Sequence, residues 1–285
     1  MKKERLAFPF KTVDLTKPEQ IKVQLQREKL NKPSNFGPTV GNYLVGGPLS
    51  QYIAENGGDE VIISGGKSVG VYVDPFRLSG DIDLKTSNPE RVIEMINDYA
   101  NDEKDIKLTV SAAKVHSTIV QKVGIDADLN GLTGHFDVDI VPKMPETQVK
   151  GTMRKLLSVD EEYTALVPSA EELVAGKLNR LIWMVSRPDI ESFPIRDLYD
   201  IYKLCEGYDV LRGVVRSMVK NIIMFNSDFA YMDEKRRAKD NFAELIEPFI
   251  DKKWEKFSGQ NVIDPNDQID DIVKFTDGLV KEMDF

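Results

Sequence analysis

The sequence predicts an α+β protein in which a strand-rich middle is flanked by helical segments. Residues 60–142 alternate between apolar and polar positions as strands do, with one helix inserted, whereas the residues on either side have helical spacing. Strands and helices segregated in this way are typical of α+β folds. We therefore expect a helical segment at 1–58 that packs on the core, a sheet core at 59–155 and a helical domain at 156–285.

The N-terminal segment is predicted to contain two helices and no catalytic residue. The first begins with Thr16 as the N-cap, Pro18 in the first turn and Glu19 three residues after the cap, and it ends near residue 30. A second apolar stretch at 43–53 ends at the Asn-Gly-Gly sequence of 56–58. We expect both helices to pack against the sheet.

A glycine pair follows the first predicted strand. Apolar residues at 61–64 indicate a short buried strand, and S-G-G-K-S comes next, so the phosphate-binding candidates are Ser64, Gly65, Gly66, Lys67 and Ser68. Glycine has no Cβ, so backbone N–H groups there can approach a phosphate closely. The loop is not a Walker A motif, because that spacing requires glycine at position 61, which is Val61. Residues 69–73 fit a helix or a strand.

Carboxylates alternate with apolar residues on two predicted strands. In the strand at 78–84, Asp81 and Asp83 share one face, and in the strand at 136–141, Asp137 and Asp139 do the same. Carboxylates on one face repel each other unless a Lys, an Arg or a divalent metal ion lies between them. Oxygen ligands of this kind suit Mg²⁺ or Mn²⁺. Side by side, the two strands could provide three carboxylates for two Mg²⁺ ions that assist transfer from a nucleoside triphosphate.

The segment between these strands, and the one after them, are less informative. A helix should begin at 87–89, two strands should follow at 106–123, and Asn130-Gly131 predicts a turn. A basic run, with one acidic residue at Glu146, then comprises Lys143, Lys150, Arg154 and Lys155. It could steer an anionic substrate, although a solvated loop is the more common role of such a run.

The chain from Ser169 onward is predicted to be helical. Ser169 and Glu172 form a capping box, and Lys177 lies at the border of the apolar stripe of that helix. Arg180 is expected to point away from the stripe. Further amphipathic stretches occupy 209–225, 227–251 and 266–283.

In the following helix, at 196–205, Asp197 lies at the edge of the stripe, and Asp200 lies further out, where it could pair with Arg196. Two hypotheses stay open for Lys177: an ion pair with Asp197 that joins the two helices, or a contact with a triphosphate.

The composition excludes several classes of protein. A net charge of −9 argues against a broad nucleic-acid-binding surface, though not against a local basic patch. Cys205 is the single cysteine, which excludes an internal disulfide, and two histidines, His116 and His135, argue against a His-rich zinc site. No apolar run follows the basic N-terminus, and no stretch reaches the roughly 18 apolar residues of a spanning helix. We expect a soluble cytoplasmic protein without membrane contact.

Four blocks in this order closely resemble the AbiEii/AbiGii toxin family of nucleotidyltransferases. They are Gly65-Gly66, the R-L-S-G-D-I-D-L of 77–84, Asp139 in its acidic strand, and the helical sequences at 171–181 and 196–201. The resemblance covers roughly residues 60–205 and implies a nucleotidyltransferase-fold mixed sheet core, with helices before it and a helical bundle after it. It also implies Mg²⁺-dependent transfer of a nucleoside monophosphate from an NTP to an acceptor, with tRNA or another RNA as the expected acceptor. Members can be toxins of type IV toxin–antitoxin pairs or serve abortive infection, so a cognate antitoxin is an expected partner.

The resemblance also implies roles for individual residues. Asp81 and Asp83 match the metal ligands, and Asp139 matches the third carboxylate, with Asp137 as its competitor. Lys177 and Asp197 match a distal catalytic pair. Arg77, with Lys67 and the basic run, is expected to bind nucleotide or RNA. The chain departs from the family at Lys67, where Thr or Ser is usual, and Ser64 or Ser68 could supply that hydroxyl.

The leading hypothesis is a toxin-type nucleotidyltransferase, and two alternatives remain open. One is a small-molecule adenylyltransferase of the aminoglycoside-modifying kind, which uses the same core chemistry. A panel of NTPs with total RNA against aminoglycosides would separate the two. The other alternative is a catalytically inactive binding protein, which absence of Mg²⁺–NTP binding would support. Residues 206–285 lie outside the resemblance and could determine acceptor choice or bind an antitoxin.

Overall fold

The computed structural model describes residues 40–73, 79–117, 120–145, 147–154, 162–187, 193–225, 232–258 and 267–283. The predicted helix at 16–30, Arg77, Glu146 and Lys155 lie outside the described residues. The chain forms two compact units, Met1–Pro168 and Ser169–Phe285. The helical part begins at Ser169 and not near residue 156, because β8 (Glu162–Pro168) pairs with β7 (Gln148–Arg154) as an antiparallel ribbon in the first unit.

The first unit is built on a mixed sheet, as predicted. The described strands of this six-stranded sheet are β1 (Val61–Ser64), β2 (Asp81–Thr86), β3 (Lys107–Val110), β4 (Lys114–Ser117), β5 (Val120–Leu129) and β6 (Leu132–Val141). Their order is β1-β2-β6-β5-β3, and β4 pairs with β5 beside β3. Only the β2–β6 pair is parallel among the pairs described. The segment 106–123, predicted as two strands, holds β3, β4 and the start of β5.

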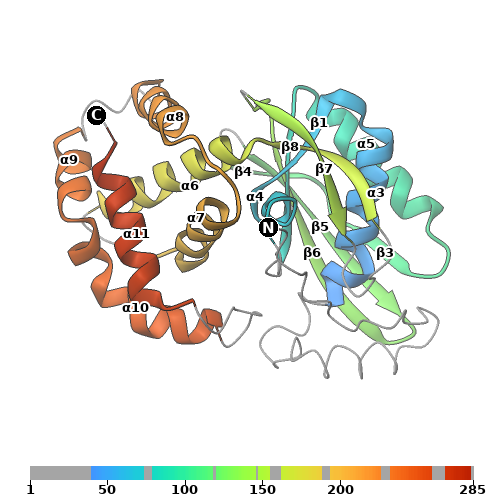
Figure 1. The fold of residues 1–285 in the computed structure, drawn as a ribbon. Helices are drawn as coiled ribbons and strands as arrows, with labels where there is room; N and C mark the ends of the chain where they lie inside the picture. Colours follow the sequence, from blue (N-terminus) through green and yellow to red (C-terminus); the bar gives the residue numbers. More distant parts are fainter. Residues whose placement is uncertain are drawn as a thin grey trace. The chain divides into compact units, whose positions relative to one another are not determined.

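One face of this sheet is apolar and covered by helices. Alternation along β2 and β6 turns Ile82, Leu84, Phe136, Val138 and Ile140 inward, and each is fully buried. The covering helices are the π-helical turn η1 (Asn42–Gly46), α3 (Gly47–Asn56) and α5 (Pro89–Asp102), which lie together on one side of the sheet in Figure 1. Burial of each such side chain contributes roughly 1.5–3 kcal/mol. The opposite face therefore carries the polar residues of the strands.

Two short helices connect the first elements. The 3-10 turn η2 (Gly58–Glu60) leads into β1, and α4 (Gly65–Val69) follows it directly. Hydrogen-bonded turns continue from α4 to Val73, so the open choice at 69–73 is settled in favour of helix and turn. The helix α5 begins at Asn88, whose side chain accepts a hydrogen bond from Arg91 N at 3.2 Å.

The described part of the second unit is entirely helical. It comprises α6 (Ala170–Val185), α7 (Ile195–Gly207), α8 (Arg212–Phe225), α9 (Met232–Asp240), α10 (Phe242–Ser258) and α11 (Ile269–Lys281). Ser169 caps α6 as predicted, because its Oγ accepts a hydrogen bond from Glu172 N at 3.2 Å. No helix in the described ranges is both long and apolar enough to cross a membrane.

Candidate active site

The carboxylates of β2 and β6 lie in matching register on the polar face of the sheet. In the parallel pair, Asp81 is the Cα partner of Asp137, and Asp83 is the partner of Asp139. Each is partly buried, and the side chain of Asp139 is 22% exposed. The alternation seen in the sequence therefore produces a compact group of four carboxylates, because adjacent strands lie only about 4.8 Å apart.

Gly65 lies directly against Asp83. The antiparallel pairing of β1 with β2 sets Ser64 opposite Asp83, and Gly65 follows with a φ of +64°. A Cβ at position 65 would lie 1.7 Å from Asp83 Oδ2. Both the positive φ and this close approach require glycine. The glycine loop and the first carboxylate pair thus form one site.

The other residues of the loop are held by internal contacts. Ser68 is fully buried, and its Oγ donates a hydrogen bond to Gly65 O at 2.9 Å, while Ser64 is buried at the end of β1. Lys67 is also buried, with Nζ donating to Gly46 O at 2.9 Å and lying 5.6 Å from the ring centre of Phe136. Burial lowers the pKa of Lys67 to about 7, although the Asp81 carboxylate opposes this shift. Its amine faces the helix-covered core.

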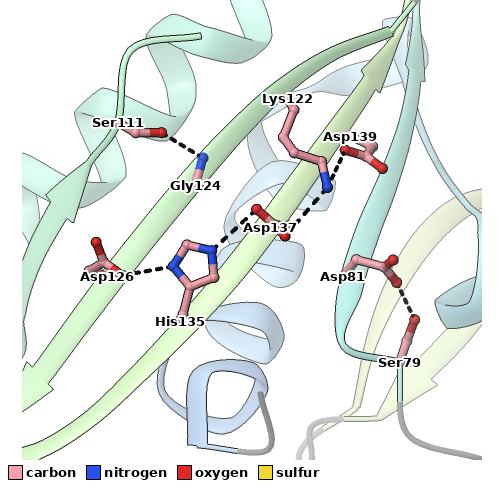
Figure 2. A network of polar contacts seen from close by, with 9 residues as sticks. All are labelled: Ser79, Asp81, Ser111, Lys122, Gly124, Asp126, His135, Asp137 and Asp139. Atoms are coloured by element: carbon pink, nitrogen blue, oxygen red, sulfur yellow. Dashed lines mark hydrogen bonds and ion pairs between the residues drawn. The ribbon is translucent and has the colours of Figure 1, made fainter. Parts of the chain in front are cut away.

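Lys122 on β5 lies between the two carboxylates of β6. Its Nζ is 3.4 Å from Asp137 Oδ2 and 3.5 Å from Asp139 Oδ1, as Figure 2 shows. Its side chain is 34% exposed. Burial lowers the pKa of Lys122, but Asp139 and Asp137 outweigh burial and leave this pKa raised. Of the two positive partners expected for alternating carboxylates, an ammonium is the one present here.

Asp139 is the least satisfied carboxylate of the group. Burial raises its pKa, and the charges of Asp81 and Asp137 add to the rise, which Lys122 opposes. Within the described part of the chain, Asp139 Oδ1 is buried and makes no hydrogen bond, because its Lys122 contact is too long or poorly directed. By contrast, Asp81 Oδ1 accepts a hydrogen bond from Ser79 Oγ at 2.9 Å. Asp139 thus lacks a strong positive partner.

The polar face continues from these carboxylates toward β3. His135 Nδ1 lies 2.7 Å from Asp126 Oδ1, and His135 Nε2 lies 3.3 Å from Asp137 Oδ1 (Figure 2). The hydrogen bond with Asp126 raises the pKa of His135, with burial opposing it and Asp137 adding to it. A hollow of about 510 Å³ adjoins His135 over β3, β5 and β6. The chemical groups on this side are hydroxyls, carboxylates and cations.

The residues fit a divalent cation in chemistry and register. Asp81, Asp83 and Asp139 provide oxygen ligands from one face of adjacent strands, and Asp139 Oδ1 has no hydrogen bond of its own in the described ranges. No group of three or more potential metal ligands among the described residues has its side chains arranged around a common point. Binding of a cation therefore requires rotation of these side chains, while the strand pairing already provides the backbone positions.

In the second unit, Lys177 forms a buried ion-pair cluster. Its Nζ lies 3.1 Å from Asp197 Oδ1 and 2.8 Å from Asp200 Oδ2, and Asp197 and Asp200 are at most 1% exposed. The structural ion pair considered for Lys177 and Asp197 is present. Two expectations were wrong. Asp200 faces inward to Lys177 and not toward Arg196. Arg180 Nε donates to Asp197 Oδ2 at 2.5 Å, because its flexible stem reaches back across the helix.

The predicted basic run is divided among different structures. Lys143 is exposed after β6, whereas Lys150 and the backbone of Arg154 belong to β7. The interpretation as a solvated loop was therefore wrong for 148–154, which pairs with β8 along its whole length. Within the described residues, Lys150 remains an exposed cation on this ribbon.

Sequence analysis missed Lys122 and His135 as members of the carboxylate network. A signal for both was available at the Asn130-Gly131 turn, whose φ values of +49° and +86° fit a type I′ hairpin. That turn pairs Leu129 with Leu132, and the resulting register sets Lys122 opposite Asp139 and Asp126 opposite His135. The turn was predicted, but its register was not carried back along the strands.

Comparisons with known proteins agree with this arrangement. A family model described as nucleotidyl transferase AbiEii toxin of a type IV toxin–antitoxin system matches residues 49–275. The crystal structure of JHP933 from Helicobacter pylori is similar, with 13% identity and a TM-score of 0.50 over 86% of this chain and 92% of that one. A candidate nucleotidyltransferase from H. pylori has 14% identity and a TM-score of 0.49 over 85% and 95%. A comparison with curated proteins gives no match.

Proposed function

The chain belongs to the AbiEii nucleotidyl transferase toxin family of type IV toxin–antitoxin systems, and from this premise we propose that it transfers a nucleoside monophosphate from an NTP to an RNA acceptor. The acceptor we favour is tRNA, the metal is Mg²⁺ or Mn²⁺, and the site of action is the cytoplasm. The physiological role we propose is that of a toxin controlled by a cognate antitoxin.

One observation carries the proposal: the glycine loop and three carboxylates meet on one face of the sheet. Asp83 touches Gly65, and Asp139 lies beside Asp83 in register. A triphosphate needs backbone N–H groups without obstructing Cβ atoms, and its reacting phosphorus needs positive charge held by carboxylates. Both features are present within one strand spacing of each other.

Asp81, Asp83 and Asp139 would hold the metal ion. Bound there, a divalent cation neutralises charge on the triphosphate and on the departing pyrophosphate. The acceptor hydroxyl attacks the α-phosphorus, the bond from that phosphorus to the β-phosphate oxygen breaks, and pyrophosphate leaves. Asp139 takes the hydroxyl proton. Burial raises the pKa of Asp139, which makes its carboxylate a stronger base than an exposed aspartate.

The glycine loop supports the direction from which each substrate approaches. Gly65 and Gly66 follow β1, on one side of the carboxylates, and β5 and β3 lie on the other. In an in-line displacement the attacking oxygen and the leaving group occupy opposite sides of the phosphorus. The acceptor therefore approaches over β6 and β5, where the hollow beside His135 lies.

The remaining assignments rest on the family resemblance. Ser64, Gly65, Gly66 and Ser68 shape the phosphate loop, and Lys67 supports that loop from the core side through Gly46 O. Lys177 and Asp197 are assigned as the second catalytic pair, with Lys177 neutralising charge on the triphosphate. Their buried ion pair, which also includes Asp200, keeps the lysine in its charged form.

The proposal is tested by incubating the protein with each α-labelled NTP, Mg²⁺ and total RNA. The wild type should label RNA, and Asp83→Asn should reduce labelling at least 100-fold. Asp98→Asn, which removes the same charge from an exposed position on α5, should not. In the same assay, His135→Ala should raise the KM for RNA and leave the KM for the NTP unchanged. Full labelling by Asp83→Asn, or transfer to aminoglycosides in preference to RNA, would refute the proposal.

A further inference from the structure

We propose that Lys122 is a resident counter-ion that occupies the third-carboxylate position of the metal site and has to be displaced from Asp139 when the metal ion binds. This inference rests on the proposed metal-dependent function. It concerns a positioning residue, which acts on the cation only through the carboxylates it holds.

The first step is that the same oxygen cannot serve both cations. Lys122 Nζ lies 3.5 Å from Asp139 Oδ1, the buried oxygen that makes no hydrogen bond in the described ranges. A Mg²⁺ ion binds carboxylate oxygen at about 2.1 Å. An ion bound to Asp139 Oδ1 would therefore lie within a few ångströms of the ammonium. Repulsion between the two positive charges then favours the departure of Lys122 from Asp139.

The second step is that Lys122 has another partner to which it can retreat. Asp137 Oδ2 lies 3.4 Å from Lys122 Nζ, and Asp137 Oδ1 lies 3.3 Å from His135 Nε2. Figure 2 shows these contacts as one line of alternating positive and negative groups along β5 and β6. Asp137 is thus fixed on its far side by His135. Lys122 can move fully onto Asp137 through rotation of its own side chain, which is 34% exposed.

These contacts give Asp137 and Asp139 different roles. Asp139 accepts the metal ion, and Asp137 holds the displaced ammonium. The sequence left open which of the two is the third ligand. The contacts distinguish them, because within the described residues Asp139 has only the long Lys122 ion pair, whereas Asp137 is engaged by both Lys122 and His135.

The test measures Mn²⁺ binding directly, by electron paramagnetic resonance on the full chain without nucleotide. Lys122→Met removes the competing charge and keeps the length of the side chain, so Mn²⁺ should bind about tenfold more tightly, from the Coulomb repulsion of charges a few ångströms apart in a water-like medium. Lys122→Arg keeps the charge and should bind as the wild type does. Lys114→Met is the matched control, since Lys114 is exposed and is the cross-strand partner of Lys122 on β4. It should change the Kd by no more than about twofold, because Lys114 has no carboxylate contact among the described residues.

Asp137 provides a second and independent variant. In the Lys122→Met background, adding Asp137→Asn should leave Mn²⁺ affinity unchanged, whereas adding Asp139→Asn should remove the gain. Loss of the gain through Asp137→Asn would overturn the assignment of roles.

Equal Mn²⁺ binding by the wild type and Lys122→Met, at a site that Asp83→Asn abolishes, would overturn the counter-ion inference alone and leave the proposed function intact. Absence of any such site in both proteins would overturn the inference together with the metal dependence of the proposed function.

Discussion

Lys67→Met should stabilise the first unit, and the gain should be largest at low pH. Burial lowers the pKa of the Lys67 amine from 10.5 to about 7. The unfolded chain therefore binds more protons than the folded chain between pH 7 and 10.5, and stability rises with pH in that window. Below pH 7 the cost of the buried charge is constant at about 5 kcal/mol. The neutral Met side chain has no such cost, and Gly46 O keeps its hydrogen bond from Ser50 Oγ.

The measurable quantity is the difference between wild type and variant at two pH values. From pH 6 to 8.5 the wild type should gain about 2 kcal/mol relative to Lys67→Met, because only the wild type loses the proton. For a unit of this size the same change corresponds to roughly 4–8 °C in Tm. All other titrating groups, including Asp139 and His135, are common to both proteins and cancel in the difference.

The assay has to report on the first unit. Both tryptophans, Trp183 and Trp254, belong to the second unit, so their fluorescence would follow the wrong transition. Hydrogen-exchange protection of β1 and β2 amides, compared between the two proteins at the same pH, reports the relevant free energy. Lys114→Met serves as the control for loss of an exposed lysine. Parallel stability profiles for wild type and Lys67→Met between pH 6 and 8.5 would refute the burial argument.

Two further predictions follow from single contacts. Gly65→Ala should abolish NTP binding in an isothermal titration and lower stability by several kcal/mol, because the new Cβ meets Asp83; Gly58→Ala, at a similar φ of +57° but with open space around it, should cost only about 1–2 kcal/mol and leave NTP affinity unchanged. Lys177→Met should destabilise the second unit by about 3–5 kcal/mol, since Asp197 and Asp200 lose a buried partner, and Trp fluorescence on urea titration would show it. Unchanged urea unfolding of Lys177→Met would contradict the buried ion pair.

The faces of the central strands could be predicted because strand periodicity is local. Alternation alone set Asp81 and Asp83 on the face opposite Ile82 and Leu84, and the structure buries those apolar residues completely. The helix cap at Ser169 was predicted for the same reason, since a capping box involves residues only three apart. Features encoded within a few residues did not depend on the rest of the fold.

Long, flexible side chains were the residues that the sequence placed least well. Lys67 was predicted to face a phosphate, yet its amine donates to Gly46 O on the core side. Arg180 was expected to point away from Asp197, and Asp200 toward Arg196, but both belong to the buried cluster around Lys177. Lys and Arg side chains extend over several rotatable bonds, so their partners are set by whichever element packs nearby.

By itself, the sequence determined an α+β chain, a glycine loop followed by alternating carboxylates, and a resemblance that the match over residues 49–275 confirms. Only the tertiary structure decided that β2 and β6 lie parallel, with Asp83 beside Asp139, and that Lys122 stands between Asp137 and Asp139. The physical reason is that periodicity fixes which side chains share a face of one strand. Which strands become neighbours, and in which register, depends on the packing of segments far apart in the chain.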